Sequence, residues 1–375
     1  MNFVIDSKYF FQNLKAIYSV LSKSNNINIL TCFILNLTNG FLKIKASDLY
    51  LCIKITLKVV SKRNGKAAVP AKLLLEILKQ LPEQPIKIKK INYNQLRISC
   101  LKGNYELGVL DHKLFPKHKK IKNPKYCMLK KDTILNIINN TLFAVGNEEL
   151  RPVLNGVCFN IKKQKGSFVA TNAKILAKYF INNLKNKDKI QFILPKKTLL
   201  ILKKIFLNNL KNKEQNKYIK IQYNKYNTWF KVSNKVLISS LIKGDVPNYD
   251  SIIPKYKIKN KLIINVQYLL KAIKRINLFS NPKDNRITFS FSLKQNIIFA
   301  ENNELTNKGF EELICEYSGE NLEISFNSKD LLEGLSNLTC KDIEIKFQDK
   351  YTPAIIQPIF SLKQEKILRI IIPLT

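Results

Sequence analysis

Near the end of the first 40% of the chain, Glu149–Ile161 reads ELRPVLNGVCFNI. Its Arg-Pro pair at 151–152 forces an extended entry, because a proline ring disfavours the helical conformation in the residue before it. The Asn-Gly pair at 155–156 is a turn signal, and the apolar run 157–161 is typical of the start of a strand. Taken alone, these features predict only the edge of a β-hairpin, so the rest of the chain must decide whether a domain opens here.

The chain has 375 residues, of which 45% are hydrophobic and 24% are charged. That length suits two or three folded domains, each with its own core. The opening MNFVIDSKYFF has Asp6 and Lys8 where a secretory signal needs apolar residues, and no window offers the roughly 18 apolar residues of a membrane span. Seven scattered cysteines without a C-x-x-C pair are typical of a reducing cytoplasm. We therefore expect a cytoplasmic protein with no membrane partner.

The net charge of +37 suggests a nucleic-acid binder. However, only six of the 64 basic residues are arginine, and lysine, asparagine and isoleucine are abundant throughout. These residues share A- and T-rich codons, so a drifted AT-rich genome would produce the same excess. The position of the lysines is therefore more informative than their number.

Three short patterns recur along the chain at similar spacing. In the first, a strand ends in alanine followed by small polar residues. This happens at Ala46, Ala170 and Ala300, which lie 124 and 130 residues apart. The regular spacing predicts a threefold internal repeat.

In the second pattern a strand leads into an amphipathic helix, beginning near Val69, Ile193 and Ser325. In the first copy, Leu74 and Leu78 belong to one apolar stripe at helical spacing. Each of the three helices carries lysine in its first turn, so a basic charge recurs with the repeat.

The third pattern is an amphipathic helix that opens each repeat, at 7–22, 131–145 and 266–279. Each repeat therefore reads helix, strands, helix, strands over about 120 to 130 residues. Lys-rich joints fall near 117–130 and 254–261. The strands are short and separated by turn residues, which predicts antiparallel sheets and an α+β fold, not a doubly wound one.

With these patterns, the chain resembles the beta subunit of bacterial DNA polymerase III, the sliding clamp family, over essentially its full length. The most specific match is RPVLNGV at 151–157, which is similar to the start of that family's middle domain. Further matches in the same order are SDLYLCI at 47–53, PNYDSIIPK at 247–255 and YSGENLEISFN at 317–327. The family implies three similar domains, each with two antiparallel sheets and two helices.

The family also implies a ring of two head-to-tail subunits closed around duplex DNA. The expected domains are 1–125, 126–255 and 256–375. The implied function is that of a processivity factor that tethers the replicative polymerase, without catalytic activity and without a cofactor. Its expected partners are double-stranded DNA, a second copy of the chain, and the catalytic subunit and clamp loader of DNA polymerase III, which bind through a short hydrophobic peptide.

Sliding requires phosphate contacts without base readout, because a base-specific contact would hold the ring at one site. Flexible lysines on inward-facing helices supply diffuse charge of that kind. The candidates are Lys72, Lys79, Lys196, Lys197, Lys203, Lys204, Lys271 and Lys274. The alternative is that many of them cover ordinary solvated helix faces.

The resemblance further implies a pocket that binds partner peptides, and it places Leu154 of the opening stretch in its lining. The expected lining residues are Leu154, Thr171, Ile175, Leu176, Pro247, Ile252, Pro353, Ile370, Ile372, Pro373 and Leu374. The family usually reads Thr-Asp-Gly-His-Arg-Leu where this chain has TNAKIL at 171–176. The His-Arg pair is thus replaced by Lys174 and Ile175, so we expect apolar anchors to dominate affinity.

The resemblance implies a subunit interface between the first domain of one chain and the third domain of another. The expected contact residues are Lys102, Tyr105, Leu107, Leu278, Phe279 and Glu304. Members of the family usually have an acidic outer surface, which the charge of +37 contradicts. We therefore expect the outer face to attract nucleic acid as well.

Catalytic and metal chemistry find little support in the sequence. His112 and His118 lie in a Lys-rich loop without cysteines or clustered carboxylates at ligand spacing. No Gly-rich phosphate loop and no nucleophile motif occurs. Asp245 and Asp250 could form a carboxylate pair but are better explained by a turn. Two rival functions remain, a generic basic nucleic-acid-binding protein and a nucleotidyl-processing enzyme, and the latter would need clustered acidic residues.

Overall fold

The computed structural model describes residues 1–21, 28–116, 124–184, 189–208, 218–254, 259–292, 295–302, 304–360 and 364–375. His118, the first part of the Lys-rich joint at 117–130 and residues 255–258 of the joint at 254–261 lie outside these residues. Within them, no helix is long and apolar enough to cross a membrane.

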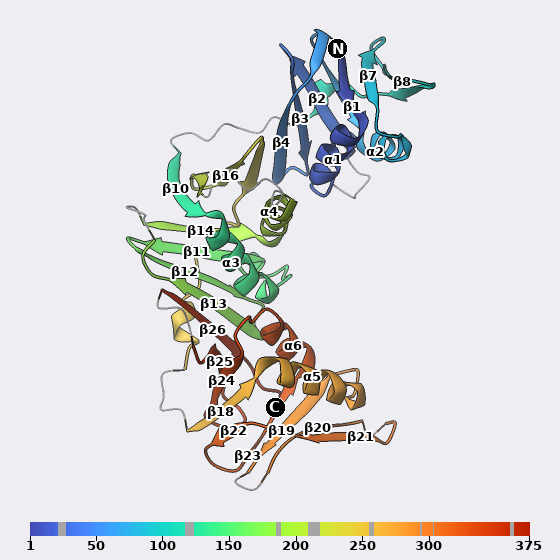
Figure 1. The fold of residues 1–375 in the computed structure, drawn as a ribbon. Helices are drawn as coiled ribbons and strands as arrows, with labels where there is room; N and C mark the ends of the chain where they lie inside the picture. The colour runs from blue at the N-terminus through green and yellow to red at the C-terminus, as the bar shows by residue number, and fades with distance from the viewer. Residues whose placement is uncertain are drawn as a thin grey trace. The chain divides into compact units, whose positions relative to one another are not determined.

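Two α-helices occur in each repeat, where the hydrophobic periodicity predicts them. They are α1 (Ser7–Tyr18), α2 (Ala71–Gln80), α3 (Lys131–Thr141), α4 (Lys196–Asn208), α5 (Val266–Ile276) and α6 (Ser328–Ser336). Asp6 and Asn265 cap α1 and α5, since their side chains accept hydrogen bonds from the first-turn N–H groups of Tyr9 and Tyr268. The helices α5 and α6 lie beside each other (Figure 1).

Short strands make up most of the remaining described chain. In the first repeat they are β1 (Asn2–Asp6), β2 (Cys32–Thr38), β3 (Phe41–Ser47), β4 (Leu51–Lys58), β5 (Val60–Arg63), β6 (Gly65–Pro70), β7 (Pro85–Lys90), β8 (Gln95–Cys100) and β9 (Gly103–Gly108). In the second they are β10 (Lys125–Lys130), β11 (Gly156–Lys162), β12 (Lys165–Thr171), β13 (Ile175–Ile181), β14 (Ile190–Pro195), β15 (Tyr218–Tyr223), β16 (Asn227–Val232) and β17 (Lys235–Ser240). In the third they are β18 (Asn260–Asn265), β19 (Arg286–Phe291), β20 (Asn296–Asn302), β21 (Asn307–Glu312), β22 (Glu316–Ser318), β23 (Leu322–Asn327), β24 (Asp342–Phe347), β25 (Ala354–Pro358) and β26 (Glu365–Ile371).

The strand order repeats three times, which confirms the internal repeat. One set of four runs β1-β7-β8-β9, and its counterparts run β10-β15-β16-β17 and β18-β24-β25-β26. The other set runs β6-β2-β3-β4, with counterparts β14-β11-β12-β13 and β23-β19-β20-β21. The pairings among described strands are antiparallel, as the alternating pattern predicts. Within the opening stretch, Pro152–Leu154 forms a 3₁₀ turn that leads into β11.

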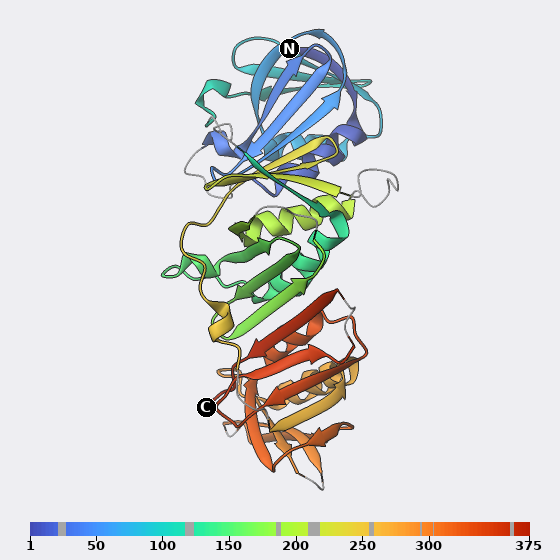
Figure 2. The same ribbon diagram turned by 90° about the vertical axis from the view of Figure 1, so that its left-hand side faces the viewer.

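Sheets from neighbouring repeats merge. Strand β4 pairs with β17, which creates an eight-stranded sheet, and β13 pairs with β26, which creates a nine-stranded sheet (Figures 1 and 2). Because of these pairings the chain divides into two compact units that cut across the repeats. The first unit comprises 1–131 and 197–241, and the second comprises 132–196 and 242–375.

The faces of each sheet follow from strand alternation. In the first unit, Phe33 of β2 packs edge-to-face against Tyr18 of α1, with ring centroids 6.5 Å apart. In the second, a Cβ built on Gly334 of α6 would meet the Ile371 side chain of β26. The residues next to Phe33 and Ile371 along their strands therefore point to the face that is turned away from these helices.

Candidate functional site

An apolar cluster lies on the nine-stranded sheet, on the face turned away from α6. Its buried members are Cys158, Val169, Leu176, Ile193, Tyr249 and Ile370. Five partly buried side chains pack against them, namely Val153, Ile242, Val246, Ile253 and Leu368. The strand registers explain the cluster, because Leu176 lies opposite Ile370 and Cys158 opposite both Val169 and Ile193. Its members come from β11, β12, β13, β14 and β26 and from the segment after β17.

The first repeat contains a counterpart of this cluster with a different side chain at its edge. Its members are Ile29, Leu30, Cys32, Ile34, Ala68 and Phe115, each at most 8% exposed. Ala68 and Ile193 occupy equivalent places, since each forms an isolated bridge to the segment after the last strand of its repeat. Phe115 of that segment covers the first cluster, whereas Val246 of the second repeat is smaller and only partly buried. The second cluster is therefore a half-open apolar surface suited to an extended peptide with hydrophobic anchors.

The tight turn between β12 and β13 borders the cluster. The Asn172 side chain accepts hydrogen bonds from the backbone N–H groups of Lys174 and Ile175, at 3.0 and 2.7 Å. The Thr171 hydroxyl donates to the carbonyl of Ile175 at 2.7 Å and accepts from the N–H of Ala173 at 3.1 Å. These polar side chains are thus used to fold the turn, and Lys174 is the exposed charge on it.

Burial keeps the two titratable groups of the cluster neutral. It raises the pKa of the Cys158 thiol to about 12 and, together with the nearby Cys158, raises the pKa of the Tyr249 hydroxyl to about 12. A thiol in that environment is neither a nucleophile nor a metal ligand at neutral pH. The cluster is therefore a binding surface without reactive groups.

Three sequence profiles match the chain in order. They describe the N-terminal, central and C-terminal domains of the DNA polymerase III beta subunit and match residues 1–119, 128–248 and 250–373. The chain belongs to the DNA polymerase III beta subunit family. Its function is therefore that of a processivity clamp in DNA replication, and it is a non-catalytic subunit, as the sequence predicts.

The similarity to known relatives covers nearly the full length of both chains. The beta sliding clamp of Halalkalibacterium halodurans is 28% identical, over 96% of each chain, and that of Bacillus subtilis is 25% identical, over 100% of this chain and 99% of the relative. The crystal structure of the DNA polymerase III beta chain from Streptococcus pneumoniae has a TM-score of 0.93 at 22% identity, covering 100% of this chain and 99% of the other. A sliding clamp from Pseudomonas aeruginosa, bound to griselimycin, has a TM-score of 0.90 at 22% identity with the same coverage. These structures share the fold of this chain.

The structure brings only part of the predicted pocket lining together. Leu176 and Ile370 are central members of the cluster. The assignment of Ile175 is wrong, because it lies opposite Ile371 and so on the face that packs toward α6. A one-residue step along a strand reverses the face, and the sequence match alone could not tell which of the two neighbours points outward.

The same offset affects both ends of the predicted pocket. Val153 packs against the cluster instead of Leu154, and Ile253 does so instead of Ile252. Pro247 follows the partly buried Val246.

Among the C-terminal residues, Ile372 is 43% exposed, and its N–H donates to the carbonyl of Lys174 at the edge of the turn. The N–H of Leu374 donates instead to the carbonyl of Ser325 on β23. Pro353, Pro373 and Leu374 lie outside the cluster as formed by the described residues.

Sequence reasoning missed most of the cluster. The missed residues are Val153, Cys158, Val169, Ile193, Ile242, Val246, Tyr249, Ile253 and Leu368. Alternation from Leu176 could have identified Val169 and Cys158 on the neighbouring strands, given the hairpin registers. The other contributions depend on the pairing of β13 with β26, which joins residues nearly 200 positions apart.

The predicted DNA-contacting lysines all lie on helices, and seven of the eight are exposed. The exception is Lys203, which is half-buried. Lys196 donates to the carbonyl of Val145 at 3.1 Å, and Lys197 donates to the carbonyl of Val20 at 3.2 Å and forms an ion pair with Asp48. Of the eight, the exposed lysines with neither an ion pair nor a hydrogen bond to the described residues are Lys72, Lys79, Lys204, Lys271 and Lys274. These five are the better candidates for mobile phosphate contacts.

At the predicted subunit interface, Tyr105 on β9 is 39% exposed and Lys102 before it is exposed. Leu107 is only 1% exposed, so it belongs to the core of its own sheet and its assignment to the exposed interface is wrong. Leu278 is 78% exposed, and the ring of Phe279 packs over Gly309 of β21.

Two acidic residues that the sequence singled out form ion pairs within the chain. Glu304 forms an ion pair with Lys283 at 2.7 Å, and Asp250 forms one with Lys178 at 2.6 Å. Asp250 lies in the 3₁₀ turn Tyr249–Ser251. The described residues contain no group of three His, Cys, Asp or Glu side chains that could hold a metal ion, and His112 belongs to none.

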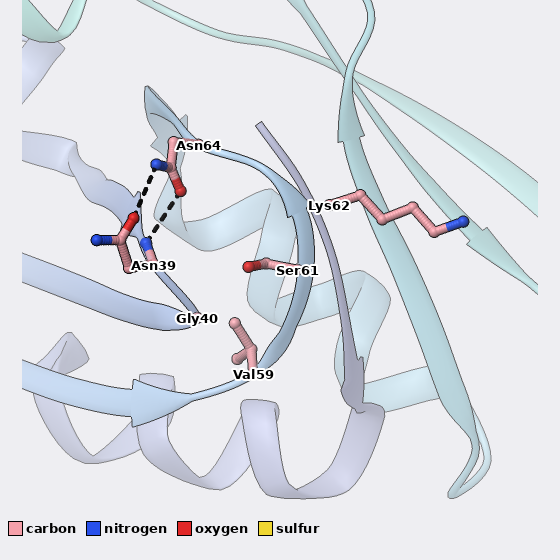
Figure 3. A pocket seen from close by; sticks show the side chains of 6 residues that line it. All are labelled: Asn39, Gly40, Val59, Ser61, Lys62 and Asn64. Carbon is pink, nitrogen blue, oxygen red and sulfur yellow. Dashed lines mark hydrogen bonds between the residues drawn. The ribbon is translucent and has the colours of Figure 1, made fainter.

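A shallow polar hollow beside the turn between β2 and β3 is shown in Figure 3. The Asn64 side chain accepts a hydrogen bond from the Asn39 N–H at 3.0 Å and donates one to the Asn39 carboxamide oxygen at 3.2 Å. The Lys62 side chain points away from this pair (Figure 3). The polar groups of the hollow thus hold the turn in place and do not converge on a ligand.

Proposed function

We propose that two copies of this chain join head to tail into a closed ring around duplex DNA in the cytoplasm, with three domains per copy at 1–125, 126–255 and 256–375. The ring tethers partner proteins through the half-open apolar cluster of the second repeat. The observation that carries the ring is the way in which neighbouring repeats are already joined within one chain.

Each internal junction pairs the same two strands of the repeat. Strand β17 pairs with β4, and its counterpart β26 pairs with β13. The remaining counterparts are β9 and β21, and each has only one neighbouring strand among those described. A third junction of the same kind needs a second copy, because an unpaired edge exposes a row of backbone donors and acceptors. Two such junctions close a head-to-tail pair into a ring.

Both internal junctions use one register. Leu237 lies opposite Ile53 in the first, and the equivalent Arg369 lies opposite the equivalent Ala177 in the second. The agreement between two junctions with unlike sequences supports the same register for the third.

In that register Tyr105 of one copy lies opposite Gly309 of the next, and Glu106 lies opposite Lys308. The second pair has opposite charges, although Glu106 now pairs with Arg97 and Lys308 with Glu301 inside the chain. Cross-strand pairs of opposite charge favour a register, whereas like charges oppose it.

The second junction also indicates what Tyr105 would contact. Its counterpart Arg369 is fully buried and lies over the ring of Phe143 at 4.6 Å. The residue equivalent to Phe143, which follows α5 in the third repeat, is Leu278. We expect Tyr105 of one copy to cover Leu278 of the next, which would bury an apolar side chain that is 78% exposed in the single chain.

For the apolar cluster we propose a short peptide with hydrophobic anchors, supplied by the catalytic subunit of DNA polymerase III and by the clamp loader. The five partly buried apolar side chains around the cluster, among them Val246 where the first repeat has the buried Phe115, support this role. The basic, partner-free lysines on α2, α4 and α5 support non-specific contacts to DNA phosphates.

Retention on DNA of different topology tests the ring. After loading onto circular duplex DNA, the labelled protein should remain bound at high salt and should dissociate once the circle is cut. A generic basic nucleic-acid-binding protein would dissociate at high salt from both forms, because screening weakens each phosphate contact equally. Salt-resistant binding that does not depend on the circle would contradict the ring.

A further inference from the structure

The eight-stranded sheet of the first unit presents a row of lysines on the face turned away from α1. Lys45 of β3 lies opposite Lys54 of β4, and Lys231 of β16 lies opposite Lys220 of β15. Val236 of β17 connects the two pairs, because it lies opposite both Lys54 and Lys231. The row points away from α1, since Lys45 lies opposite Ile34, the residue after the inward-facing Phe33. It crosses five strands, or about 19 Å.

No carboxylate balances this row. The eight strands of the sheet contain neither Asp nor Glu. The four lysines form no ion pair with the described residues. Like charges directly opposite each other in neighbouring strands oppose folding, so two such pairs in one row destabilise the free protein. Burial, and to a smaller degree the charge of Lys45, lower the pKa of Lys54.

Aromatic rings lie directly beside the lysines on the same face. Trp229 is two residues from Lys231 on β16, and the ammonium of Lys54 lies 5.2 Å from the centre of its ring. Tyr126 of β10 is 49% exposed, and the ammonium of Lys220 lies 4.4 Å from its ring centre. Gln222 connects the two aromatic residues, because it lies opposite both.

The corresponding face of the second unit has a different chemistry. The position of Lys45 is occupied there by Val169, and that of Trp229 by Ile355, which is buried. That sheet also contains acidic residues, among them Glu344 and Glu365. In the second unit the row therefore combines apolar side chains with charges that are paired, such as Glu344 with Lys346. In the first unit it holds lysines without carboxylates and aromatic rings, a contrast that a uniform drift toward lysine does not explain.

We propose that this lysine–aromatic face of the eight-stranded sheet binds single-stranded nucleic acid. Lysines in a row attract the phosphates of one backbone, and aromatic rings between them stack on bases, which only a single strand leaves accessible. A duplex would present phosphates alone, and an acidic peptide would leave the rings unused. The site lies within one unit of one chain, so it does not depend on ring closure.

Trp229 is the single tryptophan of the chain, so its fluorescence reports on this face directly. The experiment titrates the full-length protein with a 20-residue oligothymidylate, a 20-base-pair duplex and a 20-residue polyglutamate, each over a range of salt concentrations. The oligothymidylate should quench the tryptophan at the lowest concentration of the three.

The test variant is Lys220→Gln/Lys231→Gln. It leaves Lys54, whose ammonium lies over the Trp229 ring, in place. The matched control is Lys87→Gln/Lys89→Gln, which removes the same charge from exposed positions on β7 of the other sheet of this unit. The test variant should bind the oligothymidylate about tenfold more weakly. The slope of log affinity against log salt should fall by about 1.4, at roughly 0.7 for each phosphate contact on a single strand. The control should change neither value by more than about a quarter of this.

Three results would overturn the proposal. The first is the absence of quenching by the oligothymidylate in the wild type. The second is an equal loss of affinity in both double variants, which would mean that total charge alone drives binding. The third is stronger quenching by the polyglutamate or the duplex, which would assign the face to an acidic protein or to double-stranded DNA. Far-ultraviolet circular dichroism of each variant verifies that it is folded.

Discussion

Ala173 holds a backbone conformation that disfavours every side chain. Its φ is +72°, and the equivalent Leu49 of the first repeat has a φ of +82°. A left-handed conformation costs a residue with a Cβ about 1–2 kcal/mol, while glycine adopts it freely. The family's usual motif has glycine at this position, so the replacement by alanine in TNAKIL carries a strain that the hydrogen bonds of the turn must balance.

Ala173→Gly should therefore be neutral or stabilising, by up to about 1 kcal/mol, because relief of strain exceeds the added flexibility of the unfolded chain. Urea unfolding should show a higher midpoint with an unchanged slope. Ala177→Gly is the matched control, since it lies inside β13 and should destabilise the protein. A lower midpoint for Ala173→Gly would mean that the turn is not strained.

The partly buried residues of the apolar cluster are better probes of peptide binding than its fully buried members. Leu176 is only 3% exposed, so Leu176→Ala would also cost about 2–5 kcal/mol of folding stability. We predict that Ile242→Ala/Leu368→Ala weakens a fluorescent clamp-binding peptide about tenfold, or about 1.4 kcal/mol. Ile359→Ala, an exposed position in the same unit, is the control, and Lys174→Glu should have little effect. Equal affinities for wild type and the double variant would show that the peptide does not bind at this cluster.

At the scale of elements, the two free edge strands decide assembly. Lys308→Glu should weaken the dimer by about 1 kcal/mol at each of two junctions, or roughly thirtyfold in the dimer Kd, because it would place like charges opposite each other. Glu106→Lys in the same chain should restore most of the loss, since it re-creates an opposite pair. Sedimentation equilibrium measures both, and Lys165→Glu on β12 is the control. Failure of the second change to rescue the first would mean that the register is different.

The lysines on different helices should contribute unequally to DNA binding. We predict that Lys271→Gln/Lys274→Gln lowers the salt slope of retention on DNA by up to about two, at roughly 0.9 for each phosphate contact on a duplex. Lys196→Gln/Lys197→Gln should have a smaller effect on that slope, because both ammonium groups already donate to carbonyls within the chain. The reverse order of effects would assign the DNA contacts to the start of α4 and not to α5.

At the scale of the whole molecule, the joining of sheets explains why three repeats do not behave as three independent bodies. Strand pairing continues through both repeat boundaries, so each compact unit takes strands from two repeats. The same pairing rule leaves one edge at β9 and one at β21, and a second copy can satisfy both. Assembly into a ring is thus the continuation of the contacts that fold the single chain.

The sequence by itself determined the elements and their repetition. Helical stripes such as Leu74 and Leu78, and strands that end at Ala46, Ala170 and Ala300, depend on local periodicity that survives at 28% identity or less. The opening stretch RPVLNGV identified the family because its turn chemistry is local as well. The helix ends differed from the sequence prediction by a few residues, since the last turn depends on what packs against it.

Only the tertiary structure decided which neighbour in a pair faces outward and which distant strands meet. Leu176 lines the apolar cluster while Ile175 does not, and Leu107 is buried while Tyr105 is exposed. Side chains alternate with period two, so an uncertainty of one residue in a strand inverts the face. The lysine row combines Lys45 with Lys220, residues that come together only because β4 pairs with β17. Such pairings depend on long-range register, for which a local sequence pattern carries no signal.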